Sequence, residues 1–338
     1  MKKKFIATAA ATVVGISALL GGCSCTAKDP LSFSVSPENE TLTYTVQYSE
    51  DYIESYKKDA VWNDLLDFKY ENGTYVSSCK KVFDRTVINS DIKGLLNDKD
   101  IYELKTDFSI DLTFNGYHHV ETISTLTYIA PSGMSLAPLY SKESAEYLMI
   151  SSDEKNVQTS IVKSESEIFY NENNYSKTKK YKVFKTDEEI NFDDAESEEY
   201  NGNYTFRTAI DNAELYFSLR GLVSSIKEKS STNINVISPA YNEPQSVKIT
   251  HNGNSTEKEF KVKYNGVEIK EDIAYTNLAF QLSSTNSAGR PQYVSIQSGK
   301  TGELANLNLP IKFAKPLYVY GSVKNLGCLV FTLSEIER

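Results

Sequence analysis

The amino-acid sequence predicts a mainly β protein with one or two helices. The expected architecture is a long curved antiparallel sheet, or a partly closed barrel-like sheet, packed on those helices. Five Asn-Gly dipeptides punctuate the chain, and several are flanked by runs in which apolar and polar residues alternate. Asn and Gly tolerate the positive φ of tight hairpin turns, and alternation suits a sheet with one wet face. Two other segments space their apolar residues as a helix does.

The expected hairpins follow the Asn-Gly pairs along the chain. Residues 108–114 and 117–130 flank one pair, and residues 259–264 and 267–273 flank another. The five pairs are Asn72-Gly73, Asn115-Gly116, Asn201-Gly202, Asn252-Gly253 and Asn265-Gly266, and the other alternating runs are 41–48, 293–297 and 318–323. Antiparallel pairing of these runs accounts for most of the chain.

The two expected helices cover residues 51–68 and 211–229. The second repeats its leucines at steps of three and four residues. Asp211 and Glu214 stand three apart at its start, like a capping box with Asp in the hydroxyl position. Its apolar face needs a cover, and the sheet is the expected surface.

The first 22 residues have the features of a bacterial lipoprotein signal peptide. Three lysines at positions 2–4 precede an apolar run over residues 5–20, shorter than the ~20 residues of a membrane-spanning helix. The run ends in Leu20-Gly21-Gly22-Cys23, which resembles the lipobox of bacterial lipoproteins. The resemblance implies cleavage between Gly22 and Cys23 and attachment of a diacylglycerol to the Cys23 thiol.

The mature chain is expected to comprise a tether over 23–39 and one antiparallel β-rich domain over 40–338. Two or three acyl chains on Cys23 would anchor it to the extracytoplasmic face of a membrane, since each buried methylene contributes ~0.8 kcal/mol. Loss of the three signal-peptide lysines takes the formal charge from −9 to −12. So acidic a surface argues against a nucleic-acid partner.

The cysteines allow one disulfide. Cys25 lies beside the anchor, whereas Cys79 and Cys328 are far apart in sequence and could pair in an oxidising compartment. The alternative is that both are buried thiols that act as small apolar residues. No Cys/His cluster indicates zinc, and neither a metal nor a cofactor is expected.

Three parts of the body resemble an uncharacterised family of exported bacterial envelope proteins with a curved sheet like that of lipoprotein carriers. The family opens with Gly-Glu-x-Leu-x-Tyr, which residues 39–44 match with Asn39 in place of Gly. Its middle motif is Asp-x-x-Ser-x-x-Tyr-x-x-Arg. Its last motif, a Pro-containing strand followed by Gly and a later Leu, is similar to residues 289–294 and 327–333.

The middle motif is matched only in part. Asp211 and Arg220 have the family's spacing, but Glu214 replaces its Ser and Phe217 its Tyr. The resemblance implies one domain with a sheet wrapped partly round a helix, and it implies no activity. An Arg on this helix is expected to form a structural ion pair with Asp211 or Glu214.

Several short motifs do not carry the function that they suggest. Residues 298–302 contain Gly-Lys-Thr-Gly, but a phosphate-binding loop needs a Gly at position 294, which is Val. The Lys-Thr-Gly signature of penicillin-recognising enzymes lacks the accompanying motifs and helical region. The acid-rich residues 187–199 lack the pattern of a calcium loop and are expected to form a solvated loop.

The three histidines do not indicate a metal site. His119 and Glu121 could share one face of a strand, but a metal would need a further ligand. His118, His119 and His251 are expected to be exposed polar residues beside turns.

Three functions remain open. The favoured one is a binding module that holds a hydrophobic or glycan ligand in a groove of the sheet, which the 23 tyrosines would suit because each joins an apolar ring to a polar tip. The second is an envelope structural or assembly protein that acts through an exposed apolar patch on a protein partner. The third and least favoured is a hydrolase, for which converging carboxylates or a Ser/Lys pair in a pocket would be the sign.

Overall fold

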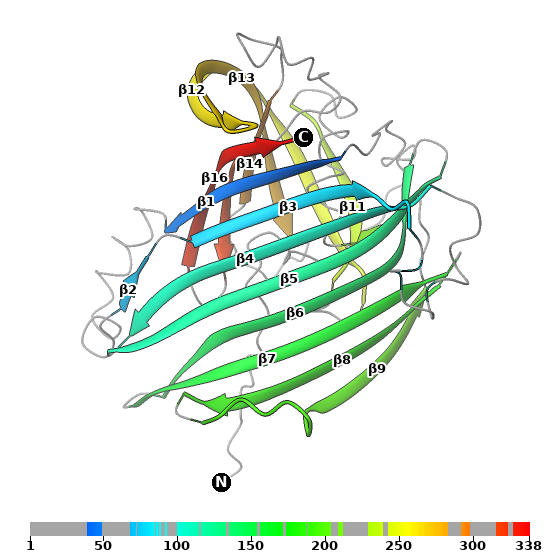
Figure 1. Ribbon diagram of the computed structural model, residues 1–338, viewed down its shortest axis with the longest axis vertical. Helices are drawn as coiled ribbons and strands as arrows, with labels where there is room; N and C mark the ends of the chain where they lie inside the picture. The colour runs from blue at the N-terminus through cyan, green and yellow to red at the C-terminus, as the bar shows by residue number, and fades with distance from the viewer. Residues whose placement is uncertain are drawn as a thin grey trace.

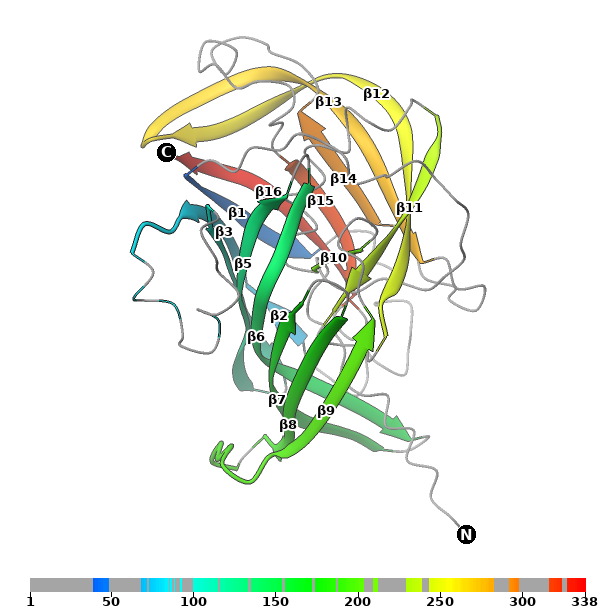
Figure 2. The same cartoon turned by 90° about the vertical axis from the view of Figure 1, so that its right-hand side faces the viewer.

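All sixteen strands in the described part of the chain belong to one strongly curved sheet (Figures 1 and 2). The computed structural model describes residues 39–48, 68–71, 73–84, 86, 88, 92, 100–114, 116–132, 135–153, 156–171, 174–186, 188–203, 209–211, 229–238, 243–282, 292–297, 316–323 and 327–338. The mainly β, antiparallel architecture expected from the sequence is therefore confirmed.

Sixteen strands form this sheet. In chain order they are β1 Glu40–Tyr48, β2 Phe68–Tyr70, β3 Gly73–Lys81, β4 Tyr102–Phe114, β5 Tyr117–Ser132, β6 Ser135–Asp153, β7 Asn156–Tyr170, β8 Asn174–Lys185, β9 Glu196–Asn203, β10 Ala209–Asp211, β11 Ser231–Ile237, β12 Gln245–Tyr264, β13 Val267–Leu282, β14 Gln292–Gln297, β15 Pro316–Val323 and β16 Gly327–Glu337.

Two runs of neighbouring strands meet at β1. Strands β3 to β9 form one antiparallel run, and β11 to β16 form the other. Strand β1 lies between β3 and β16, so Thr41 pairs with both Ser78 and Glu337. Two motifs of the family resemblance, near the two ends of the body, therefore lie on adjacent strands.

The ends of the sheet curl inward. The long hairpin of β12 and β13 has register shifts after His251 and Ser255, and the end of β12 reaches back to pair with β16 (Figure 1). Strand β10 pairs in parallel with β11 and lies inside the curved sheet (Figure 2). Strand β9 ends the other run and pairs with β8 alone among the described strands.

Two Asn-Gly pairs form the predicted turns. Gly116 between β4 and β5 has φ 77°, and Asn265 and Gly266 between β12 and β13 have φ 47° and 83°. The other described positions differ from the prediction. Gly73 begins β3, and Asn201-Gly202 and Asn252-Gly253 lie within β9 and β12.

The inner face of the sheet is the face on which alternate side chains are buried. Near β1, β3, β4 and β16 it is aromatic: the ring of Tyr75 lies 5.7 Å from that of Tyr44 and 5.8 Å from that of Phe331, and Phe108 lies 6.2 Å from Phe331. Such pairs contribute about 0.5–1.5 kcal/mol each beyond their burial. This end of the inner face is the main apolar core.

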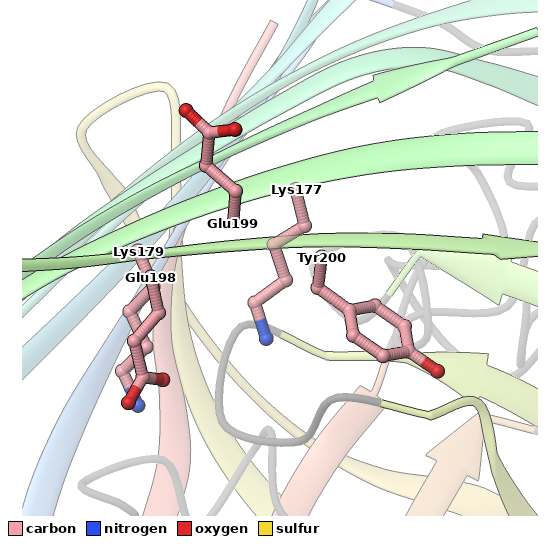
Figure 3. Close-up of a pocket in the computed structure, with 5 residues that line it drawn as sticks. All are labelled: Lys177, Lys179, Glu198, Glu199 and Tyr200. Carbon is pink, nitrogen blue, oxygen red and sulfur yellow. The ribbon is translucent and has the colours of Figure 1, made fainter.

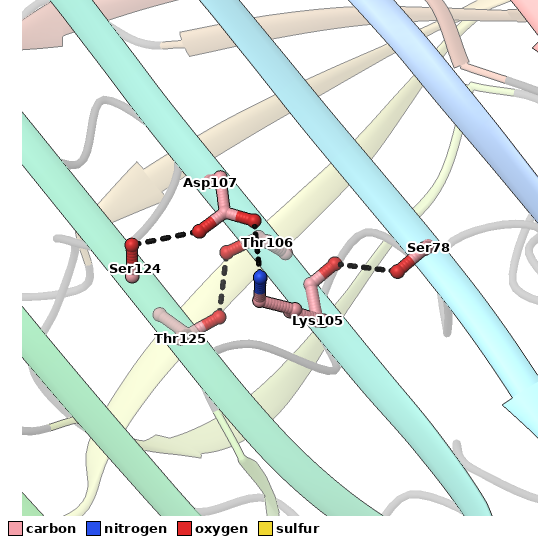
Figure 4. Close-up of polar contacts among 6 residues, drawn as sticks. All are labelled: Ser78, Lys105, Thr106, Asp107, Ser124 and Thr125. Atoms are coloured by element: carbon pink, nitrogen blue, oxygen red, sulfur yellow. Dashed lines mark hydrogen bonds and ion pairs between the residues drawn. The ribbon is translucent and has the colours of Figure 1, made fainter.

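The outer face of β3 to β5 is polar, as the alternation predicts. Lys105 contacts Asp107 at 3.0 Å, and the Ser124 hydroxyl donates to Asp107 at 2.7 Å (Figure 4). Thr106 and Thr125 share a hydrogen bond on the inner side of the same strands. Near the other end of β5, Tyr128 and Tyr140 form a second, smaller apolar cluster with Ile88, Ile92 and Ile101.

The two expected helices lie outside the described residues, apart from their ends, where Phe68 belongs to β2 and Asp211 to β10. Within the described part of the chain, no helix combines the length and apolar character needed to cross a bilayer. Part of the acid-rich stretch is not a loop, because residues 196–199 belong to β9.

Gly73→Ala is expected to destabilise the sheet by about 1–3 kcal/mol. A Cβ at this position would lie 2.6 Å from the Ser109 carbonyl oxygen and 2.9 Å from the Ile110 Cβ, so β3 and β4 would have to separate. Urea unfolding would measure the loss. At Gly116 a Cβ has nothing within 4 Å, so Gly116→Ala should cost only about 1 kcal/mol, from its positive φ. A larger loss at Gly116 than at Gly73 would contradict the prediction.

Candidate functional site

Polar side chains interrupt the apolar inner face of β5 to β9. Thr127, Ser141 and Lys177 are buried on this face, at 0%, 3% and 2% exposure. A buried polar group costs free energy unless it is hydrogen-bonded, so a band of such groups has either a structural or a functional reason.

Asp211 explains part of this polar band. Strand β10 brings its fully buried carboxylate onto β5, β6 and β7. The hydroxyls of Thr127 and Ser141 donate to Oδ1 at 3.4 and 3.2 Å, and the Tyr170 hydroxyl donates to Oδ2. Three donors on three strands satisfy the charge and fix β10 against the inner face.

A pocket lies beside this network, at the inner side of β8 and β9. Its volume is about 310 Å³, within the range of small-molecule sites, and it is open to solvent on one side. Lys177, Lys179, Glu198 and Tyr200 extend into it from one side of the two strands, and Glu199 points the other way (Figure 3).

The strand register explains why these side chains meet. Lys177 and Lys179 are two residues apart and therefore share one face of β8. Across the strands, Lys177 pairs with Tyr200, and Lys179 pairs with Glu198. The Lys177 ammonium donates to the Ser238 carbonyl at 3.3 Å, which ties β8 to the end of β11.

Burial, the largest effect, and the neighbouring Lys179 together lower the pKa of Lys177 to about 8, against the opposing effects of Glu143 and Glu198. Glu143, on the inner face of β6, is affected in the opposite sense. Desolvation and the nearby Asp211 raise its pKa to about 7, against the attraction of Lys177 and Lys179. Near neutral pH, this site therefore holds an acid and an amine that are both close to titration.

Ser166 connects Glu143 to the pocket. It pairs with Glu143 on β6 and with Lys179 on β8. Its buried hydroxyl has no hydrogen-bond partner among the described residues. A bound polar ligand could supply that partner.

A second pair of buried titratable residues lies farther along β5. His119 and Glu121 share the inner face, as predicted, but at 5% and 0% exposure they are buried, so the expectation of exposed residues is wrong. Desolvation lowers the pKa of His119 to about 4 and raises that of Glu121 to about 8. The described residues contain no group of three His, Cys, Asp or Glu side chains suited to a metal.

The other two histidines also follow the sheet. His118, on the outer face, is exposed as expected and lies 3.2 Å from Asp111. His251 is buried at 4% exposure in β12, so the expectation of an exposed residue is wrong there too.

The proposed Cys79–Cys328 disulfide is incompatible with the register. Cys79 pairs with Glu40 at the start of β1, and Leu329, next to Cys328, pairs with Tyr48 at its end. At about 3.3 Å per residue the backbones are roughly 26 Å apart along β1. A disulfide needs Cα atoms within about 7 Å. Cys79 is instead buried on the inner face, as the alternative for that residue proposed.

The other expected site residues lie outside the described residues. These are the lipidation and cleavage residues Gly22 and Cys23, and Glu214 and Arg220 of the ion pair. Of that ion pair, Asp211 is described, and it accepts hydrogen bonds from the three hydroxyls. The Gly-Lys-Thr-Gly segment at 298–302 also lies outside the described residues.

Comparison with known proteins gives little for function. No family model matches the chain, and no curated protein matches its sequence. Among solved structures, the β-barrel-like protein of domain of unknown function DUF1849 from Brucella abortus is similar over 90% of this chain and 98% of its own, with 6% identity and a TM-score of 0.42. A likeness of this size carries no argument, so function has to be argued from the site.

Proposed function

We propose that the protein is an extracytoplasmic binding module that holds a polar, acid-bearing ligand, such as an acidic saccharide, in the pocket of β8 and β9. The proposal rests on one observation: Lys177 and Lys179 point into the same pocket as the ring of Tyr200. An anionic group would relieve the repulsion between the two ammonium groups, and a sugar ring would lie against the tyrosine.

The polar lining favours the glycan alternative of the sequence-based expectation over the hydrophobic one. A lipid groove is lined mainly by apolar side chains, whereas four of the five residues lining this pocket are charged. The buried Ser166 hydroxyl beside it supplies a further donor for a hydroxylated or charged ligand.

The described surface gives less support to an assembly protein. Among the described residues, the large apolar side chains that are exposed are Phe83, Val120, Val183 and Val267. Val120, Val183 and Val267 lie on β5, β8 and β13, which are not neighbours in the sheet, and Phe83 follows β3, so they do not form the contiguous patch that a protein interface needs. A ligand-binding role is therefore preferred.

Attachment to a membrane is part of the proposal. Acylation of Cys23 would hold the module by its tether on the extracytoplasmic face, where it meets envelope glycans. Mass spectrometry of the N-terminal peptide from intact cells would test the anchor independently of ligand binding, and a mature chain without acyl groups would contradict it.

The binding test compares two lysines of one strand. Lys179 faces the pocket, and Lys180, the next residue of β8, is exposed on the other face. Binding of the full-length protein to an array of acidic and neutral saccharides would identify a ligand, and titration calorimetry would measure its affinity. Lys179→Gln is expected to weaken acidic ligands about 10- to 100-fold, as for one hydrogen bond to a charged group, and Lys180→Gln to leave them unchanged. Equal effects of the two variants, or no preference for acidic saccharides, would refute the proposal.

A further inference from the structure

The amine of Lys177 lies in an environment that favours nucleophilic chemistry. Lys177 is 2% exposed, yet it lines an open pocket of about 310 Å³ that admits a small molecule. Its neighbour on β7 is the fully buried Ile168, and a second ammonium, that of Lys179, lies two residues along the same face. Desolvation and a neighbouring cation are the two means by which proteins activate lysine amines.

We propose that Lys177 is a carbonyl-reactive lysine, whose amine forms an imine with the aldehyde or ketone of an acid-bearing ligand in the β8–β9 pocket. The inference rests on the proposed function in one respect, because it uses the same pocket and has Lys179 bind the acid group of the ligand. It adds a covalent step and a ligand class: oxo acids, or acidic sugars in their open-chain carbonyl form.

The step balances with Lys177 of the pocket and the nearby Glu143 on the inner face of β6. The neutral Lys177 amine attacks the carbonyl carbon, and a C–N bond forms while the carbonyl π electrons move to oxygen. That oxygen receives the proton that nitrogen gives up, so the adduct is a carbinolamine. Glu143, whose pKa is about 7, donates a proton to the hydroxyl. The nitrogen lone pair forms the C=N bond as the C–O bond breaks and water leaves, so the imine remains in its protonated form and Glu143 is left as the carboxylate.

The charges around the amine set its pH dependence. Lys179 disfavours the ammonium form of Lys177, and Glu143 and Glu198 favour it, with burial as the largest effect. At pH 8 about half of Lys177 is then neutral, against roughly 0.4% of an exposed lysine with a pKa of about 10.4. A weaker base is also a weaker nucleophile, which reduces this advantage of about 100-fold to roughly tenfold in rate.

Reductive trapping tests the inference on the full-length protein. The protein is treated at pH 8 with glyoxylate, an aldehyde that carries a carboxylate, and cyanoborohydride, which reduces the imine to a stable amine. Peptide mapping then measures the adduct at each lysine. We expect Lys177 to be labelled about tenfold faster than Lys180 of the same strand, with a rate that is greatest between about pH 7 and 8, because lower pH protonates the amine and higher pH deprotonates Glu143. Labelling of lysines in proportion to their exposure would overturn the inference.

Variants and a second aldehyde separate the roles in the pocket. Lys177→Arg keeps the charge and should abolish the selective adduct, and Glu143→Gln should slow it by about tenfold or more. Propanal, which has no carboxylate, should label Lys177 more slowly than glyoxylate, and Lys179→Gln should remove that difference. If Lys177→Arg leaves the fast adduct in place, the imine is excluded.

The two proposals can fail separately. Acidic saccharides that bind in a Lys179-dependent way without selective labelling of Lys177 would refute only the imine. Selective labelling without a preference for acidic ligands would refute the acid-binding function and leave the reactive amine.

Discussion

Asp211→Ala is expected to lower the free energy of unfolding by about 3–4 kcal/mol, the largest loss that we predict for a single side chain. The change removes a fully buried acceptor and leaves the hydroxyls of Thr127, Ser141 and Tyr170 to find new partners. Each hydrogen bond to a charged group contributes about 1.5–3 kcal/mol, and the Thr127–Ser141 bond at 3.1 Å recovers part of the loss. Urea denaturation followed by tyrosine fluorescence would measure it.

Two further variants test whether the lost hydrogen bonds cause the destabilisation by Asp211→Ala. Tyr170→Phe removes one donor and should cost about 1–2 kcal/mol, and less than that in the Asp211→Ala background, because the two groups share one bond. Asp193→Ala, which changes an exposed carboxylate in the loop before β9, should cost under about 0.5 kcal/mol. Additive effects of Asp211→Ala and Tyr170→Phe would show that the network does not hold β10.

Glu121→Gln is expected to stabilise the protein at pH 8 by about 2–3 kcal/mol and to have little effect near pH 4.5. Burial raises the pKa of this carboxyl from 4.5 to about 8. The folded state therefore holds its proton more tightly than the unfolded state between these values, and stability falls as the pH rises through this window. The full shift corresponds to about 5 kcal/mol, and water that reaches a charged carboxylate through local opening would reduce it by about half.

The control for this prediction is an exposed carboxyl. Unfolding free energies at pH 5, 6.5 and 8 should diverge between the wild type and Glu121→Gln, while Glu189→Gln, in the loop before β9, follows the wild type at every pH. The amide can still accept the bond that the Leu148 N–H donates to Oε1 at 3.1 Å, so the local structure is retained. A difference between wild type and Glu121→Gln that does not change with pH would contradict the prediction.

The hairpins could be predicted from sequence because their signals are local. At Asn265-Gly266 both residues need positive φ, and the strands on either side alternate. At Asn201-Gly202 the same dipeptide lies within a strand, and its glycine is required for a different reason. A Cβ on Gly202 would lie 2.5 Å from the Tyr175 ring, so packing between β8 and β9 selects the glycine there. A dipeptide alone does not distinguish a turn from a close contact between strands.

The pocket could not be predicted, since its signals are not local. Strand β8 carries lysines on both faces, at 177 and 179 on one and at 180 and 182 on the other, so alternation does not show which face is buried. Burial of Lys177 depends on Ser238, 61 residues later in the chain. The place of Asp211 at the start of an expected helix, and its spacing from Arg220, indicate a structural role, but its partners on β5, β6 and β7 could be identified only from the fold.

The position of β1 between β3 and β16 bears on how the chain reaches its native state. Strands β4 to β8 are joined through connections of two or three residues, so each can add to the one before it with little loss of loop entropy. The hydrogen bonds at the second edge of β1 can form only when β16 is available, nearly 300 residues later, because Thr41 pairs with Glu337. Contacts of such sequence separation form late and slowly. A polypeptide threaded through a translocon from its N-terminus would thus remain incompletely folded until its final residues had passed.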